Sequence, residues 1–124
     1  MLEIYSLNVT VPADTAIPLN NTTIEKGETA THTAPNTIQL NKCGVYMVTC
    51  DASATTTPTI QLYKDGIAQP QAQSTGSNAG FITLVQVDHN NSNCCCASPT
   101  ILQIFNTTAE ATFTNVNVCV TKVC

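Results

Sequence analysis

Charged and aromatic side chains are scarce in this sequence. Only 10% of its 124 residues are charged, with four basic and eight acidic residues, and tryptophan is absent. A nucleic-acid-binding protein requires a basic stripe or patch, so we predict no nucleic-acid partner. The chain nevertheless contains too many apolar runs for a disordered acidic protein. A surface rich in threonine and asparagine with so few charges is typical of a protein that packs against copies of itself.

Targeting and membrane signals are missing as well. Residues 1–6 have no basic region, no continuous apolar core and no small-residue cleavage site, so they do not resemble a secretory signal. No stretch approaches the run of about 20 apolar residues that a membrane-spanning helix requires. We therefore expect synthesis in the cytosol without a signal peptide, and no membrane partner.

Cysteine, in contrast, is abundant. The seven cysteines are an odd number, which leaves one thiol unpaired in a fully oxidised monomer and favours intermolecular pairing. Three of them are adjacent at positions 94–96, and neighbouring cysteines fit disulfide geometry only in a strained form, so their partners lie elsewhere. Abundant cysteine without an export signal fits a protein that is oxidised after cell lysis, as on the surface of a spore or phage particle.

The cysteines fall into two sets by position. Cys43 and Cys50 lie at opposite ends of one predicted strand, too far apart to pair with each other at about 3.3 Å per residue. Either could be a small core residue, and we expect this of Cys50. The other set lies in one loop and the final strand, and we predict that it forms covalent cross-links: Cys94, Cys95, Cys96, Cys119 and Cys124. As the terminal residue, Cys124 is the best candidate for an intermolecular bond.

Strand patterns extend through nearly the whole sequence, whereas helical periodicity is almost absent. The clearest strand covers residues 44–52, and because both of its faces are largely apolar we expect it to be covered on both sides. The pair Asp65-Gly66 predicts a tight hairpin, and an out-of-phase apolar position predicts a bulge near Asn115. About ten short strands with turn signals between them predict an all-β fold, a ten-stranded jelly-roll sandwich.

Three segments resemble a known fold. Residues 41–48, 60–66 and 111–116 resemble the trimeric jelly roll shared by tumour-necrosis-factor-like and complement globular-head domains. Residues 11–22 sharpen this, because they are similar to the C-terminal domain of BclA-type collagen-like glycoproteins of bacterial exosporium hairs. The resemblance covers residues 11–123 and implies a homotrimer. The collagen-like stalk is missing and cysteines replace residues that are usually apolar or polar, so we expect the domain to be mounted in another way.

Residues 1–10 precede the domain of residues 11–124, and two interpretations of them stay open. In the first, this apolar segment is a connector that docks on a neighbouring trimer by strand addition or by filling a groove. Its docking residues would then be Leu2, Ile4, Tyr5, Leu7 and Val9. In the second, the segment is simply the first strand of its own sheet.

Metal and catalytic sites are not predicted. His89 stands close to Cys94, but three consecutive cysteines do not match the spacing of two to four residues between zinc ligands. Acidic residues lie mostly at strand ends and turns, where some relatives of this fold hold calcium, and we do not predict a calcium site. No oxyanion loop, phosphate loop or pair of carboxylates points to catalysis. We therefore expect no enzyme activity, no cofactor and no metal.

Two functions are consistent with these features. The first is a non-enzymatic structural subunit that trimerises and stacks into a disulfide-hardened extracellular fibre or coat on a bacterial spore. Its partners would be copies of itself and other spore-surface proteins. The alternative is a trimeric phage head-fibre or spore-tip module that binds carbohydrate or a host surface through an apical loop at residues 74–80. The scarcity of aromatic residues, which sugar sites normally use, speaks against this alternative.

Overall fold

The computed structural model describes residues 1–27, 29–34, 36–87 and 100–124. Within these residues the chain forms eleven strands, one more than the sequence predicts, and the all-β expectation is confirmed. The strands are β1 (Leu2–Val11), β2 (Thr15–Ala16), β3 (Asn21–Glu25), β4 (Ala30–Ala34), β5 (Thr37–Leu40), β6 (Gly44–Ala54), β7 (Thr59–Lys64), β8 (Ile67–Thr75), β9 (Asn78–Val87), β10 (Thr100–Asn106) and β11 (Ala111–Lys122). The described residues contain no helix that is long and apolar enough to cross a membrane.

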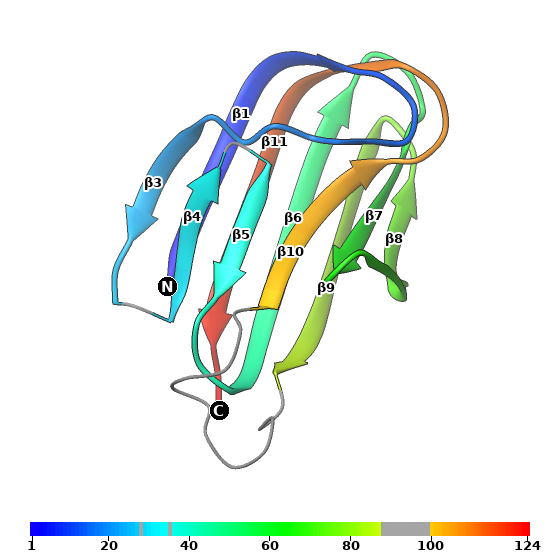
Figure 1. Ribbon diagram of the computed structural model, residues 1–124. Coiled ribbons are helices and arrows are strands. Elements are labelled where there is room, and N and C mark those ends of the chain that lie inside the picture. Colours follow the sequence, from blue (N-terminus) through cyan, green and yellow to red (C-terminus); the bar gives the residue numbers. More distant parts are fainter. Residues whose placement is uncertain (28, 35, 88–99) are drawn as a thin grey trace.

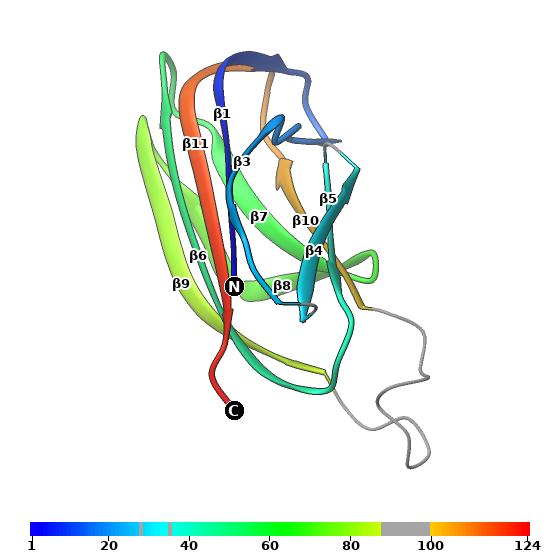
Figure 2. The ribbon, with the colours of Figure 1, turned by 90° about the vertical axis from the view of Figure 1, so that its left-hand side faces the viewer.

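The strands form two antiparallel sheets that face each other (Figures 1 and 2). The first sheet has the order β3-β1-β11-β6-β9, so β3 and β9 are its edges. The second sheet has the order β4-β5-β10-β7-β8, and the short β2 pairs with β10. Most neighbours come from distant parts of the sequence, and only β4-β5 and β7-β8 are consecutive strands among the described residues. The predicted jelly-roll sandwich is confirmed.

The core lies between the sheets because alternate side chains of each strand point inward. On β6, Tyr46, Val48 and Cys50 are buried in this core, whereas the alternating Met47 and Asp51 are exposed. The sequence predicts that both faces of this strand are covered. Within the described residues the inward face is covered, whereas on the outward face Val45 and Thr49 are half-buried and Met47 and Asp51 are exposed.

Local turn signals give the expected geometry. Asp65 and Gly66 have φ angles of 51° and 80°, the left-handed conformation that a tight hairpin between β7 and β8 requires. The bulge expected near Asn115 is confirmed by a register shift between Phe113 and Asn115 in the pairing of β11 with β6. The loop expected at residues 74–80 is shorter than predicted. β8 ends at Thr75 and β9 begins at Asn78, so only two residues connect them.

A buried asparagine holds the end of β10. Asn106 is 0% exposed, and its Nδ2 donates hydrogen bonds to the carbonyl oxygens of Val11 at 3.0 Å and Ala109 at 2.7 Å. These bonds join the end of β1 to the loop between β10 and β11. Within the described residues, every fully buried polar side-chain atom has a hydrogen-bond partner.

Candidate functional site

An apolar surface lies on the outward side of the first sheet, at the edge formed by β9. Met47 of β6 and Ile82 and Leu84 of β9 point away from the core, with exposed fractions of 37%, 73% and 61%. Met47 pairs directly with Leu84, and Thr49 with Ile82, so the three apolar side chains are neighbours. A contiguous group of exposed apolar side chains is a candidate interaction site.

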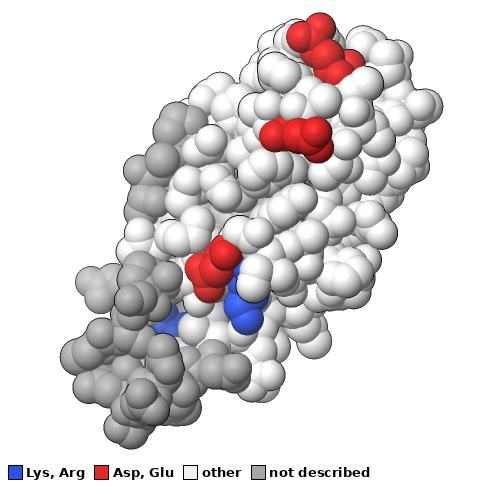
Figure 3. All heavy atoms as spheres, turned by 45° about the vertical axis from the view of Figure 1, so that its right-hand side comes forward, with Lys and Arg blue, Asp and Glu red and all other residues white. Residues whose placement is uncertain are grey.

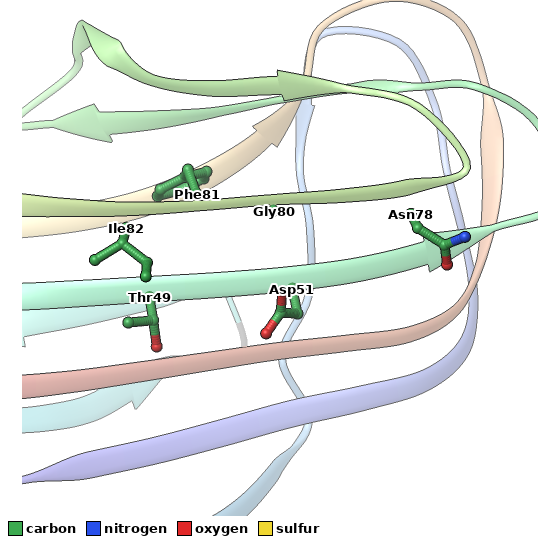
Figure 4. Close-up of a pocket in the computed structure, with 6 residues that line it drawn as sticks. All are labelled: Thr49, Asp51, Asn78, Gly80, Phe81 and Ile82. Carbon is green, nitrogen blue, oxygen red and sulfur yellow. The ribbon is translucent and has the colours of Figure 1, made fainter.

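A hollow adjoins this apolar surface (Figure 4). Its volume is about 710 Å³, and it is lined by Thr49, Asp51, Asn78, Gly80, Phe81 and Ile82. The glycine at position 80 leaves room for the Asp51 side chain, because a Cβ there would lie 2.7 Å from Asp51 Oδ1 and 3.0 Å from the carbonyl oxygen of Cys50. We call Met47, Ile82, Leu84 and this hollow the β6–β9 face.

Beside the β6–β9 face, the outward side of the first sheet continues over β11 and β1, where it carries polar side chains and a thiol. Cys119 of β11 lies opposite Thr49 of β6 on one side and opposite Glu3 of β1 on the other. Its thiol is half-buried and free. Cys119 therefore lies in the middle of the outward side of the first sheet, beside the β6–β9 face.

The structure places two of the five predicted cross-linking cysteines. Cys94, Cys95 and Cys96 lie outside the described residues, so their cross-links stay predictions. Cys119 and Cys124 are free thiols, half-buried and exposed respectively. A cross-link through either of these two also stays a prediction.

The backbone of Cys124 is held in place although its side chain is exposed. Its N–H and that of Val123 both donate to the carbonyl oxygen of Val45, at 3.3 and 2.8 Å. Its own carbonyl oxygen packs so closely on Gly44 that a Cβ at Gly44 would lie 2.6 Å away. The Cys124 thiol is therefore presented at the end of the sandwich where β6 begins, away from the hollow.

The remaining described cysteines, Cys43 and Cys50, have different states. Cys50 is buried as expected, and burial, with the neighbouring Asp51 charge, raises the pKa of its thiol to about 12. Such a thiol stays protonated and unreactive near neutral pH. Cys43 takes part in a disulfide bond.

The predicted docking residues all lie on β1, which pairs within its own chain with β11 and β3. Leu2 and Ile4 are 0% exposed and belong to the core. Tyr5 and Val9 are half-buried, and Leu7 is 52% exposed. A docking role for this strand toward another trimer stays a prediction, and Leu7 is its most accessible apolar side chain.

Metal ligands do not gather in the described part of the chain. Among those residues, no group of three or more His, Cys, Asp or Glu side chains is placed to hold a metal ion. His89, which the zinc alternative required, lies outside the described residues.

The β6–β9 face is the part of the site that sequence reasoning missed. Ile82 and Leu84 alternate with Thr83 and Val85, so both sides of this strand are apolar. That pattern fits equally well a strand covered on both sides. Only the tertiary structure distinguishes the two cases, because in the described residues no further layer packs on the outward side of the first sheet.

Comparisons with known proteins identify the fold. No protein-family model and no curated protein matches the sequence. The globular domain of zebrafish complement 1qA protein matches with a TM-score of 0.69 and 7% identity, over 95% of this chain and 94% of that chain. PRD1 vertex protein P5 matches with a TM-score of 0.67 and 13% identity, over 99% and 96%.

Rabbit GITRL also matches, with a TM-score of 0.63 and 9% identity, over 100% of this chain and 95% of that chain. Likenesses at such low identity show the fold alone. The chain has the jelly roll of tumour-necrosis-factor-like and complement globular-head domains, as the sequence resemblance implies.

Proposed function

We propose that this chain is a non-enzymatic structural subunit that assembles into a homotrimer through the β6–β9 face. The observation that carries the proposal is the group of exposed apolar side chains Met47, Ile82 and Leu84. Burying the part of each side chain that is still exposed against another copy would be favourable, by less than the about 1.5–3 kcal/mol that applies to a fully exposed side chain. The scarcity of charge in the chain keeps the cost of removing water from the contact low.

The position of the patch favours a cyclic assembly. It lies at one edge of the first sheet, and the outward sides of β11 and β1 continue beside it. An edge of one copy can pack on the face of the next, and a contact between two different surfaces repeats until the ring closes. Three is the number that the resemblance to trimeric jelly rolls implies.

The proposal also covers where the trimer is located and how trimers are attached to one another. The similarity of residues 11–22 to BclA-type domains supports a place on the bacterial spore surface, where trimers stack into a fibre or coat. Other spore-surface proteins would be further partners. The exposed Cys124 lies away from the hollow and stays accessible after trimerisation.

A covalent link between trimers would follow cell lysis. Two Cys124 thiols of different trimers would lose two protons and two electrons to dioxygen or another environmental oxidant and form one disulfide. Cys119, on the outward side of the first sheet, would be covered by a neighbouring copy instead. Cys124 is therefore the described cysteine best placed to harden a fibre.

Light scattering coupled to size-exclusion chromatography tests the trimer. We expect the wild type, kept in reductant so that no disulfide joins trimers, to have three times the 13.1 kDa mass of one chain. Ile82→Lys places a charge in the contact and should give a folded monomer. Ile67→Lys is the matched control, since Ile67 is 68% exposed on β8 of the other sheet, and it should remain trimeric. A wild-type mass of one or two chains would overturn the proposal.

A further inference from the structure

The outward side of the second sheet carries an aromatic pair. Tyr63 of β7 and Phe105 of β10 have ring centroids 4.4 Å apart and planes inclined by 40°. Both point away from the core, because their strand neighbours Leu62 and Ile104 are buried, and both rings are half-buried. Two of the six aromatic side chains of this chain therefore meet on an open sheet surface.

Polar groups with free hydrogen-bonding capacity flank the pair. Gln103 lies directly opposite Tyr63 in the ladder, and Gln73 lies opposite Gln61, which in turn pairs with Phe105. Within the described part of the chain, neither the Tyr63 hydroxyl nor the Gln103 and Gln73 amides form a hydrogen bond. The Gln61 amide differs, because it donates to carbonyl oxygens of β7 and β8 and stabilises the sheet itself.

Glutamine is concentrated on this sheet. Six of the seven glutamines in the sequence lie on β5, β7, β8 and β10, and only Gln86 lies on the first sheet. An amide both donates and accepts hydrogen bonds, as the hydroxyl group of a sugar does. The surface is therefore suited to a ligand with many hydroxyl groups.

Charged side chains are few on this side of the molecule, but they are present. Figure 3, turned so that the right-hand side of Figure 1 comes forward, shows separate acidic and basic groups on the visible face. The nearest two are engaged within the protein: Lys64 Nζ donates to the carbonyl oxygen of Gln86 at 2.6 Å, and Asp65 Oδ1 accepts from the N–H of Ile101 at 2.9 Å. The surface therefore matches a neutral ligand better than an ionic one.

We propose that the surface formed by Tyr63, Phe105, Gln73 and Gln103 binds a neutral polysaccharide. The negative face of an aromatic ring attracts the polarised C–H groups of a sugar ring. The free amides and the Tyr63 hydroxyl would bind the sugar hydroxyls. A cross-strand aromatic pair also stabilises a sheet, but that role needs no free polar groups around it.

This binding does not depend on the proposed trimer. The surface lies on the second sheet, on the opposite side of the sandwich from the β6–β9 face. A trimer formed through the first sheet would leave three such surfaces facing outward, which would strengthen attachment to a polymer with repeated units. The apical connection between β8 and β9 is not required.

Affinity electrophoresis tests the proposal. Native gels are cast with amylose, a β-1,3-glucan, galactomannan or hydroxyethyl cellulose as neutral probes, and with alginate as an anionic one. We expect at least one neutral polysaccharide to retard the wild type. Phe105→Leu, which keeps apolar volume but removes a ring, should lose most of the retardation. Tyr63→Phe, which removes only the hydroxyl, should weaken it several-fold.

Tyr5→Phe is the matched control, since it removes a tyrosine hydroxyl from the first sheet, and it should bind as the wild type does. Circular dichroism and light scattering on each variant separate lost binding from lost folding or lost trimerisation. Absence of retardation in every neutral gel would overturn the proposal. So would equal retardation of the wild type and Phe105→Leu, or retardation by alginate alone.

Discussion

The carboxylate of Asp51 lies against the backbone of Gly80 on the neighbouring strand, so closely that a Cβ at Gly80 would stand 2.7 Å from Asp51 Oδ1. The two residues are directly paired between β6 and β9. Asp51 is the charged residue among those that line the hollow, and Gly80 leaves space for its carboxylate. The position of the Asp51 carboxylate in the β6–β9 face therefore depends on the lack of a Cβ at Gly80.

Gly80→Ala should weaken trimerisation while leaving the fold intact. The added methyl group displaces the Asp51 side chain and partly fills the hollow, and overpacking of this kind costs about 1–3 kcal/mol at a contact. Sedimentation over a range of protein concentrations measures the shift in the monomer–trimer equilibrium. Ser77→Ala, in the connection before β9, is the control and should not change it. A trimer of unchanged stability would show that the neighbouring copy does not occupy the hollow.

Asn106→Ala should lower the free energy of unfolding by about 1–3 kcal/mol, because it leaves buried carbonyl oxygens without a donor. Urea denaturation, followed by circular dichroism, measures this on the monomeric Ile82→Lys background, where subunit dissociation does not contribute. Asn117→Ala is the matched control, since Asn117 is half-buried on the outward side of β11 and should cost less than about 0.5 kcal/mol. Equal effects of the two changes would contradict the holding role of Asn106.

Cys50 should make the protein less stable at alkaline pH. Burial raises the pKa of its thiol from 9.0 to about 12, so the folded state retains a proton that the unfolded state loses. The stabilising contribution is thus complete below pH 9 and is lost as pH rises toward 12, with a slope of up to about 1.4 kcal/mol per pH unit. The Tyr46 pKa is raised in the same direction, by burial, and adds to the loss above pH 10.

Urea denaturation at several pH values between 8 and 11 checks this expectation. Cys50→Ala should reduce the alkaline slope, although its overall stability falls because a buried sulfur is removed. Val48→Ala, which shortens a buried side chain that cannot ionise, should leave the slope unchanged. A slope that persists in full after Cys50→Ala would contradict the assignment.

Among the described cysteines, Cys124 should form the intermolecular disulfide. After air oxidation, we expect covalent oligomers on a gel run without reductant, and Cys124→Ser should remove most of them. Cys119→Ser should retain them, because a neighbouring copy covers that thiol in the proposed trimer. Oligomers that persist in Cys124→Ser would assign the link to another cysteine, and a gel with monomer alone would reject intermolecular cross-linking.

Features that depend on adjacent residues could be predicted from the sequence. Asp65 and Gly66 adopt a turn because both tolerate positive φ, and the bulge near Asn115 follows from the phase of apolar residues within one strand. The burial of Cys50 follows from its position in an alternating strand. These properties are local, so the sequence by itself determined them and, together with a distant resemblance, the class of fold.

Features that depend on which strands become neighbours were decided by the tertiary structure. The apolar pattern of β9 would be the same if another layer covered its outward side, and only the two-layer arrangement of the described residues leaves Ile82 and Leu84 exposed. The hollow requires Gly80 opposite Asp51, and the aromatic pair requires Tyr63 beside Phe105, which are 42 positions apart in the sequence. Periodicity along one strand contains no information about its partner, because many registers bury the same apolar faces, and packing of the whole chain selects one of them.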